Sequence, residues 1–232
     1  MLPLPANRYR PGARQRGEDT RRRILETALS LFAAEGFDSA STRTIAEQAG
    51  VNLPAIQYYF GSKDGLYRAA IAHIGEQAEQ AIAPIAARVH AALDSGTPTR
   101  AELIELLCEM VDTLLTLFLD ENVPGRESRS LFVSRVEIEH TEALDPLNEM
   151  MRELVMAPCS ALVGRLVDRP AEDEQVILRT LMIVGQAKIF CSRLVIRALH
   201  WNTIGDSRVA QVKALVDQHT RAICHSLTGA AA

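Results

Sequence analysis

Apolar residues recur at helical spacing along almost the whole of this 232-residue chain. In TRRRILETALSLFAAEG, the side chains of Ile24, Leu25, Ala28, Leu31 and Phe32 fall on one face of a helix. Further helical segments are predicted at residues 66–93, 99–120, 127–140, 146–168, 172–200 and 206–227. The turn-forming sequences DSGTP, NVPG and DRP separate several of them. No stretch of useful length alternates with period two, so the pattern predicts an all-α fold.

Three shorter helices are predicted after the first one, each marked by a residue that caps its first turn. Ser41 or Thr42 is expected to cap the first, which contains TIAEQA. Asn52 is expected to cap the second, with Pro54 in its first turn, where a missing N–H costs nothing. Ser62 is expected to cap the third.

The first two of these short helices have the residue spacing of a helix-turn-helix. Ala46 is small enough to let the two helices approach closely, and Gly50 supplies the positive φ of a tight turn. Ile45, Val51 and Ile56 are placed to fill the space between the helices. This combination predicts a helix-turn-helix, whose second helix enters the major groove in DNA-binding proteins.

The second short helix ends in QYYF, which places three aromatic side chains in a row in an aromatic-poor chain. On a helical wheel centred on Ile56, Tyr59 and Phe60 lie near the core, whereas Gln57 and Tyr58 point away from it. An outward tyrosine alone is most simply a chance surface residue. Beside a helix-turn-helix and a basic segment, its hydroxyl is suited to a phosphate contact.

Lys63 lies in the first turn of the helix that Ser62 is expected to cap. A lysine is locally unfavourable there, because the helix dipole already makes that end positive. An external anion would relieve this, since free N–H groups and the ammonium would converge on it. A phosphate of the DNA backbone would supply such an anion.

The net charge of −4 conceals an asymmetry along the chain. Residues 1–68 carry ten Lys/Arg and seven Asp/Glu (+3), and the remainder carries 15 and 22 (−7), which sum to −4. Seven arginines lie within the first 23 positions. A basic end on an acidic body favours a polyanionic partner for the amino-terminal part, although a solvated disordered tail would have the same composition.

Residues 20–67, and above all Ala-Ile-x-Tyr-Tyr-Phe-x-Ser-Lys-x-x-Leu, resemble the DNA-binding domain of TetR-type transcriptional regulators. The segments LDPLNEMMRELVMAPCSALVGRLV and IVGQAKIFCSRLVIRALHW are similar, more loosely, to the CecR-type subgroup. The resemblance implies an all-α dimer whose three N-terminal helices bind a double-stranded DNA operator. A small molecule bound to the carboxy-terminal domain would release the protein, usually a repressor, from that DNA.

The resemblance also assigns domains and DNA-contact positions. The expected parts are a basic flexible tail (residues 1–17), a helix-turn-helix DNA-binding domain (18–66) and a larger ligand-binding and dimerisation domain (67–232). The implied DNA-contact positions are Thr42, Arg43, Leu53, Pro54, Gln57, Tyr58, Tyr59 and Lys63. Gln57 stands where the family usually has tyrosine, which is expected to change the base preference. Tyr59 stands where the family often has histidine, which is expected to exchange one phosphate donor for another.

The last two predicted helices carry enough apolar surface for an interface. Residues 176–199 are apolar around much of the helix, and 206–227 carry a single apolar stripe. Together they suit a four-helix homodimer interface, with an intramolecular core as the alternative.

The sequence gives a set of candidates for the lining of an effector pocket. Methionine is adaptable and common at apolar binding sites, so an apolar or amphipathic effector is expected. A hydrophobic core without a ligand site would show the same pattern of methionine and aromatic residues at helical spacing. The candidates are Met110, Leu114, Phe118, Phe132, Met151, Cys159 and Phe190.

No motif in the sequence supports catalysis, a cofactor or a metal site. There is no Gly-x-Ser-x-Gly, HExxH or glycine-rich phosphate loop, and the four cysteines are too widely spaced for a CxxC pair. We expect buried, reduced thiols in a cytoplasmic protein without a membrane span. The alternative function is a helical ligand-binding or scaffold protein without DNA binding.

Overall fold

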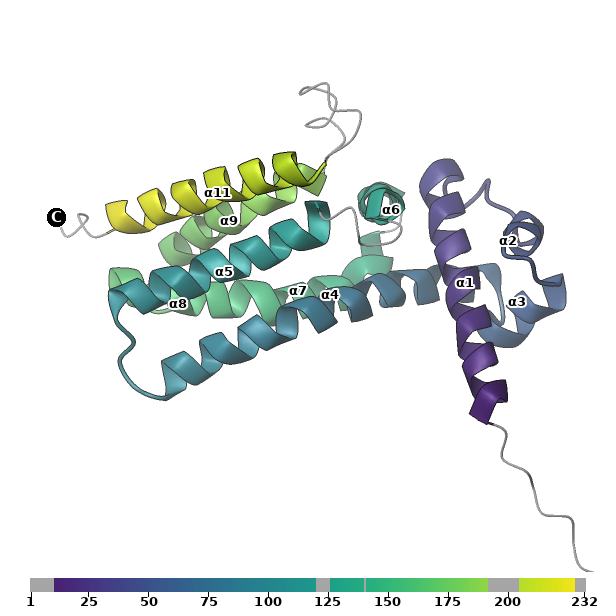
Figure 1. Cartoon of the computed structure of the whole chain (residues 1–232), viewed down its shortest axis with the longest axis horizontal. Coiled ribbons are helices and arrows are strands. Elements are labelled where there is room, and N and C mark those ends of the chain that lie inside the picture. The colour runs from purple at the N-terminus through teal and green to yellow at the C-terminus, as the bar shows by residue number, and fades with distance from the viewer. Residues whose placement is uncertain (1–10, 120–125, 140, 192–204, 228–232) are drawn as a thin grey trace, which may run out of the picture. The chain divides into compact units, whose positions relative to one another are not determined.

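The computed structural model describes residues 11–119, 126–139, 141–191 and 205–227 (Figure 1). Every secondary-structure element in these ranges is helical, which confirms the predicted all-α class. The chain divides into two compact units, residues 1–70 and 71–232. No helix in the described ranges is long and apolar enough to cross a membrane.

The smaller unit consists of α1 (Pro11–Glu35), α2 (Thr42–Gln48), α3 (Leu53–Phe60) and the start of α4 (Lys63–Asp94). Helix α1 begins within the range that the sequence analysis assigns to the basic tail. The core of the unit is formed by side chains that are fully buried or nearly so, namely Ile24, Leu25, Phe32, Ile45, Ile56 and Leu66. These residues come from all four helices, so a small apolar core positions α3.

The caps of the short helices form as the sequence predicts. Of the two candidates before α2, Ser41 is the cap, because its Oγ accepts the Thr44 N–H at 3.0 Å. The Asn52 Oδ1 accepts the Ala55 N–H at 3.0 Å at the start of α3. Each cap satisfies an N–H group that the first turn would otherwise leave unpaired.

Two glycines determine how α3 connects to its neighbours. Gly50, between α2 and α3, has the positive φ of 63° that the predicted turn requires. Gly65, in the first turn of α4, lies so close to the end of α3 that a Cβ atom would come 2.1 Å from the Phe60 carbonyl oxygen. Its N–H is bonded to the Ser62 Oγ at 2.9 Å, which caps α4 as expected.

The larger unit contains the rest of α4 and a helical bundle. Its elements are α5 (Arg100–Leu119), α6 (Arg126–Glu139), η1 (Thr141–Leu144), α7 (Asp145–Met151), η2 (Arg152–Met156), α8 (Ala157–Val167), α9 (Glu174–Lys188), η3 (Ile189–Cys191) and α11 (Asp206–Ser226). Helix α5 is central, with α8, α9 and α11 packed along it (Figure 1). Its ten buried residues contribute much of the core.

Two predicted helices differ in detail from the structure. The segment predicted as one helix over 146–168 contains a π-helical turn, η2, in which the Ala157 N–H bonds to the Arg152 carbonyl. Pro158 has no N–H to donate, which weakens the α-helical pattern at this place. The segment predicted over 172–200 ends as α-helix at Lys188, and its residues 192–200 lie outside the described ranges.

Arg100, at the start of α5, joins the ends of two other helices. Its guanidinium donates to the Leu166 carbonyl at 3.0 Å and to the Cys224 carbonyl at 2.6 Å. These carbonyls belong to the last turns of α8 and α11, where acceptors lack helical partners and the dipole is negative. One cation therefore caps two helices.

Three of the four cysteines are free and buried, as expected: Cys108, Cys159 and Cys224. Burial raises the pKa of the Cys108 and Cys159 thiols to about 12, and that of Cys224 to about 11. These thiols are therefore protonated and unreactive at neutral pH. The side chain of Cys191 lies outside the described part.

Candidate nucleic-acid interface and ligand region

Six of the eight predicted DNA-contact residues line one hollow in the smaller unit. The hollow has a volume of about 650 Å³ and lies among the first turn of α2, the outer face of α3 and the first turn of α4. Its lining consists of Thr42, Leu53, Pro54, Ile56, Gln57, Tyr58, Ser62 and Lys63. Residues 21 positions apart in the sequence thus meet on one surface, and Arg43 and Tyr59 are outside it.

The outer face of α3 is exposed where a recognition helix requires it. The Tyr58 side chain is 82% exposed and the Leu53 side chain 48% exposed. Gln57 and Pro54 are also exposed, whereas Ile56 is buried against the core. This agrees with the helical wheel of the sequence analysis.

The three aromatic rings of α3 contact one another and also helix α1. The Tyr58 and Tyr59 rings meet edge to face with centroids 5.0 Å apart, and Tyr59 lies 6.1 Å from Phe60. The Arg21 guanidinium of α1 lies over the Phe60 ring, 5.5 Å from its centroid. Tyr59 and Phe60 are half-buried, so the α1–α3 packing supports the exposed Tyr58 ring.

Arg43 lies on the exposed side of α2 and is paired within its helix. Its Nε donates to the Glu47 Oε1 at 3.2 Å, one helical turn away. Both side chains are largely exposed, so the pair contributes little to stability.

Lys63 has partners within the protein that the dipole argument did not anticipate. Its ammonium donates to the Asp38 carbonyl at 3.1 Å and lies 4.8 Å from the centroid of the Phe37 ring. The lysine therefore fastens the α1–α2 connection to the start of α4. A phosphate contact by Lys63 stays a prediction.

The predicted pocket residues lie in the interior of the larger unit. Met110, Leu114 and Cys159 are fully buried in its main core, and Phe118, Met151 and Phe190 pack against that core partly buried. Phe132 of α6 is also buried. Their role as an effector lining stays a prediction.

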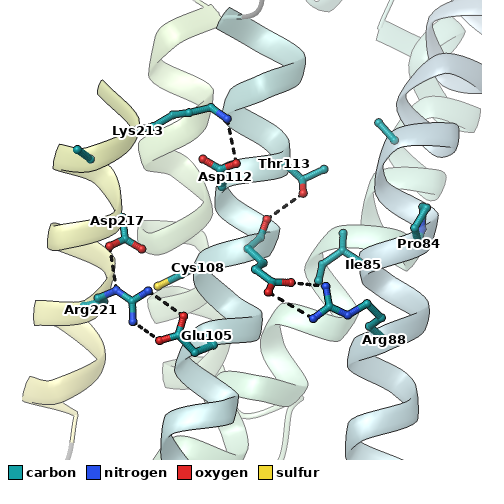
Figure 2. Close-up of a pocket in the computed structure, with 13 residues that line it drawn as sticks. Pro84, Ile85, Arg88, Glu105, Cys108, Asp112, Thr113, Lys213, Asp217 and Arg221 are labelled. Carbon is teal, nitrogen blue, oxygen red and sulfur yellow. Dashed lines mark hydrogen bonds and ion pairs between the residues drawn. The ribbon is translucent and has the colours of Figure 1, made fainter. Parts of the chain in front are cut away.

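A groove of about 580 Å³ lies between α4, α5 and α11 in the larger unit (Figure 2). Helix α4 contributes Ala81, Pro84, Ile85 and Arg88, while α5 and α11 contribute mainly charged side chains. Cys108 also lines it, and no residue from the predicted pocket does.

The charges of the groove are paired, both across helices and within α11. Arg221 of α11 binds Glu105 of α5 through two nitrogens, and its Nε donates to Asp217 at 2.8 Å. Hydrogen bonding to Arg221 lowers the pKa of both carboxyls. Lys213 donates to Asp112 at 2.9 Å. On the other side of α5, Arg88 of α4 pairs with Glu109 (Figure 2).

This groove was not predicted from the sequence, although the spacing of its charged residues is visible there. Glu105, Glu109 and Asp112 recur at helical spacing on α5, and Lys213, Asp217 and Arg221 do so on α11. Each set predicts a charged helix face. Only the packing shows that the two faces meet.

Six large apolar side chains of α9, η3 and α11 are exposed in the single chain, and this set is hereafter called the α9–α11 face. It consists of Ile177, Leu178, Leu181, Met182, Ile189 and Leu215. On the opposite side of α9, Val176 and Ile183 are fully buried. The apolar residues of this helix therefore serve both an intramolecular core and an exposed surface.

Comparison with known proteins gives two consistent family matches. Residues 24–70 match the family described as bacterial regulatory proteins, tetR family. Residues 103–227 match the C-terminal domain of the HTH-type transcriptional dual regulator CecR. The second match alone spans more than half of the chain.

Individual relatives agree with these matches. The chain is 26% identical over 220 residues to the dual regulator CecR of Shigella flexneri, which covers 94% of this chain and 97% of that protein. It is 32% identical over 126 residues to the transcriptional repressor NicS of Pseudomonas putida, which covers 50% and 57%.

A solved structure supports the fold. The crystal structure of AibR in complex with isovaleryl coenzyme A and operator DNA has a TM-score of 0.60 and 15% identity, and the match covers 86% of this chain and 97% of that one.

Proposed function

The chain belongs to the TetR family of bacterial regulatory proteins, with a CecR-type C-terminal domain, and from this premise we propose that it is a ligand-released repressor. In this proposal, a homodimer binds a palindromic operator in the cytoplasm through the helix-turn-helix of α2 and α3. The observation that carries the proposal is the surface on which six of the eight predicted contact residues gather. The names of the relatives support control of transcription, since NicS is named a repressor and CecR a dual regulator.

The contacts divide between bases and phosphates. Arg43 and Gln57 have side chains suited to guanine and adenine in the major groove, where each good pair contributes roughly 1–3 kcal/mol of discrimination. Tyr58, Tyr59, Thr42 and Lys63 are assigned to the sugar-phosphate backbone, which fixes register without reading sequence. Arg43 would exchange its exposed contact with Glu47 for the base.

Dimerisation is supported by the α9–α11 face. A partly exposed row of large aliphatic side chains is unusual on a monomer and typical of an interface. A two-fold axis would pack this face against its own copy and form a four-helix interface. Each dimer would then present two α3 helices to successive major grooves, roughly 34–36 Å apart.

The effector is proposed to bind in the larger unit and to be apolar or amphipathic. The apolar interior around Met110, Phe118 and Met151 supports this, because thioether and aromatic side chains adapt to varied ligands. The isovaleryl coenzyme A bound to AibR is one amphipathic ligand carried by the same fold. Release from DNA requires only that the effector favour a dimer whose α3 spacing no longer fits the operator.

The test is DNA binding by the purified full-length protein. Fragments of its own upstream region are titrated at physiological salt, and protection mapping defines the operator. We expect a specific complex with two-fold symmetric protection, which acyl coenzyme A thioesters or another amphipathic probe weakens. An Arg43→Ala/Tyr58→Ala variant, altered only at exposed positions, should lose the complex and keep its circular dichroism spectrum. A folded dimer that binds no fragment would instead support a scaffold protein.

A further inference from the structure

The first turn of α3 presents two apolar side chains and no polar one. Leu53 is 48% exposed, and Pro54 beside it is exposed as well. In a helix-turn-helix, the N-terminal residues of the second helix contact the base edges. The part of α3 that reaches furthest into the groove therefore has no side-chain donor or acceptor.

The backbone of this turn is also poor in donors. Pro54 has no N–H, and the Ala55 N–H is already donated to the Asn52 Oδ1 at 3.0 Å. Helix N-termini that bind phosphate do so through N–H groups of this kind. The start of α3 is thus unsuited to the DNA backbone and suited to an apolar group.

Polar readout begins one turn later. Gln57 follows Leu53 at i+4 and lies on the same helix row, and Tyr58 follows Pro54 in the same way. A glutamine in the major groove pairs best with adenine through its N6 and N7 atoms. An apolar contact and an adenine contact therefore lie one helical turn apart on one surface.

We propose that Leu53 and Pro54 form an apolar ledge that reads the C5-methyl group of a thymine in each operator half-site. Thymine is the base that presents a methyl group in the major groove, so an apolar ledge selects it. The base pair that Gln57 reads lies next to this thymine or one step from it. This inference rests on the DNA binding proposed above and specifies which base chemistry the first turn of α3 recognises.

The test replaces thymine by uracil in the mapped operator, one symmetric pair of positions at a time. Uracil keeps the pairing and hydrogen-bonding groups of thymine and lacks only the methyl. At the recognised position we expect about fourfold weaker binding per half-site, which corresponds to roughly 0.8 kcal/mol for one buried methyl-sized group. Substitution in both half-sites should give about 16-fold.

Two variants assign the effect to the ledge. Leu53→Ala is an exposed truncation that leaves the Asn52 cap in place, and it should reduce the preference for thymine over uracil at the sensitive position, because only Pro54 of the ledge remains. Gln57→Ala is the matched control on the next turn, and it should keep the methyl sensitivity while losing the preference for adenine.

The outcomes separate the inference from the function on which it rests. If no DNA is bound specifically, the proposed function fails. If a specific operator exists but every uracil substitution changes affinity less than twofold, the ledge does not read a methyl group. Sensitivity that persists unchanged in both Leu53→Ala and Pro54→Ala would likewise overturn the proposal.

Discussion

A charge on the α9–α11 face tests the dimer most directly, and Met182→Glu is the variant of choice. Met182 is 68% exposed in the single chain, the highest value among the apolar residues of this face. The fold of the protomer therefore gains little from its side chain. A change in assembly can then be separated from a change in folding.

The expected magnitude follows from this exposure and from two-fold symmetry. Full burial of a methionine contributes about 1.5–3 kcal/mol, so burying the exposed two thirds contributes about 1–2 kcal/mol per copy. In a two-fold dimer of Met182→Glu, this burial free energy is lost at both copies. The dimer must also desolvate two unpaired carboxylates, at several kcal/mol each. A total of at least about 5 kcal/mol weakens the dimer by more than about a thousandfold.

The assay combines sedimentation equilibrium, urea unfolding and operator titration on one preparation. We expect a folded Met182→Glu monomer that binds a half-site weakly and has lost the tight complex with the full operator. Ala91→Glu is the matched control, because it adds the same charge at an exposed α4 position outside the face. A Met182→Glu protein that remains dimeric at nanomolar concentration would refute the assigned interface. A monomer with full operator affinity would refute the coupling of assembly to DNA binding.

Three further variants test contacts within the units. Gly65→Ala places a Cβ 2.1 Å from the Phe60 carbonyl oxygen, so it should lower the melting temperature of the protein and weaken operator binding. An unchanged melting temperature would contradict this close approach. If Lys63 contacts a phosphate, Lys63→Ala should lower the slope of log binding constant against log salt concentration by about 1. An unchanged slope together with reduced thermal stability would mean that Lys63 contacts only Phe37 and Asp38 and has a structural role. Arg221→Met should destabilise the protein by at most about 1 kcal/mol at pH 7, because its side chain and those of its partners are partly exposed. Since Arg221 lowers the pKa of Glu105 and Asp217, this stabilisation is present above their ordinary pKa values and is lost as pH falls through the lowered ones. In urea unfolding, the difference in free energy of unfolding between the wild type and Arg221→Met should therefore shrink between about pH 5 and pH 2. A difference that stays constant over this range would contradict the role of the two carboxylates.

Local features of the fold were predictable from the sequence because their causes are local. The Ser41, Asn52 and Ser62 caps each bond an N–H three residues away, and the turn at Gly50 needs only its own φ. The exposed face of α3 followed from helical periodicity in the same way. Such contacts depend on neighbours within one turn of the chain.

Contacts between distant segments were not predictable. The Asp38 carbonyl that binds Lys63 lies 25 residues away, and Glu105 and Arg221 are 116 residues apart. Nothing in the sequence fixes which charged faces of α5 and α11 meet. For the same reason, the apolar pattern of α9 could not show that Ile183 faces the core while Met182 is exposed.

The Arg100 contact has a consequence for the rates of folding and unfolding. Its two acceptors lie 66 and 124 residues further along the chain, so the contact forms only after α8 and α11 have docked beside α5. We therefore expect this contact to be absent from the folding transition state, so that its loss acts mainly on the unfolding rate. Arg100→Met should therefore unfold faster at nearly unchanged folding speed. The Arg100 guanidinium would then prolong the lifetime of the native state without accelerating its formation.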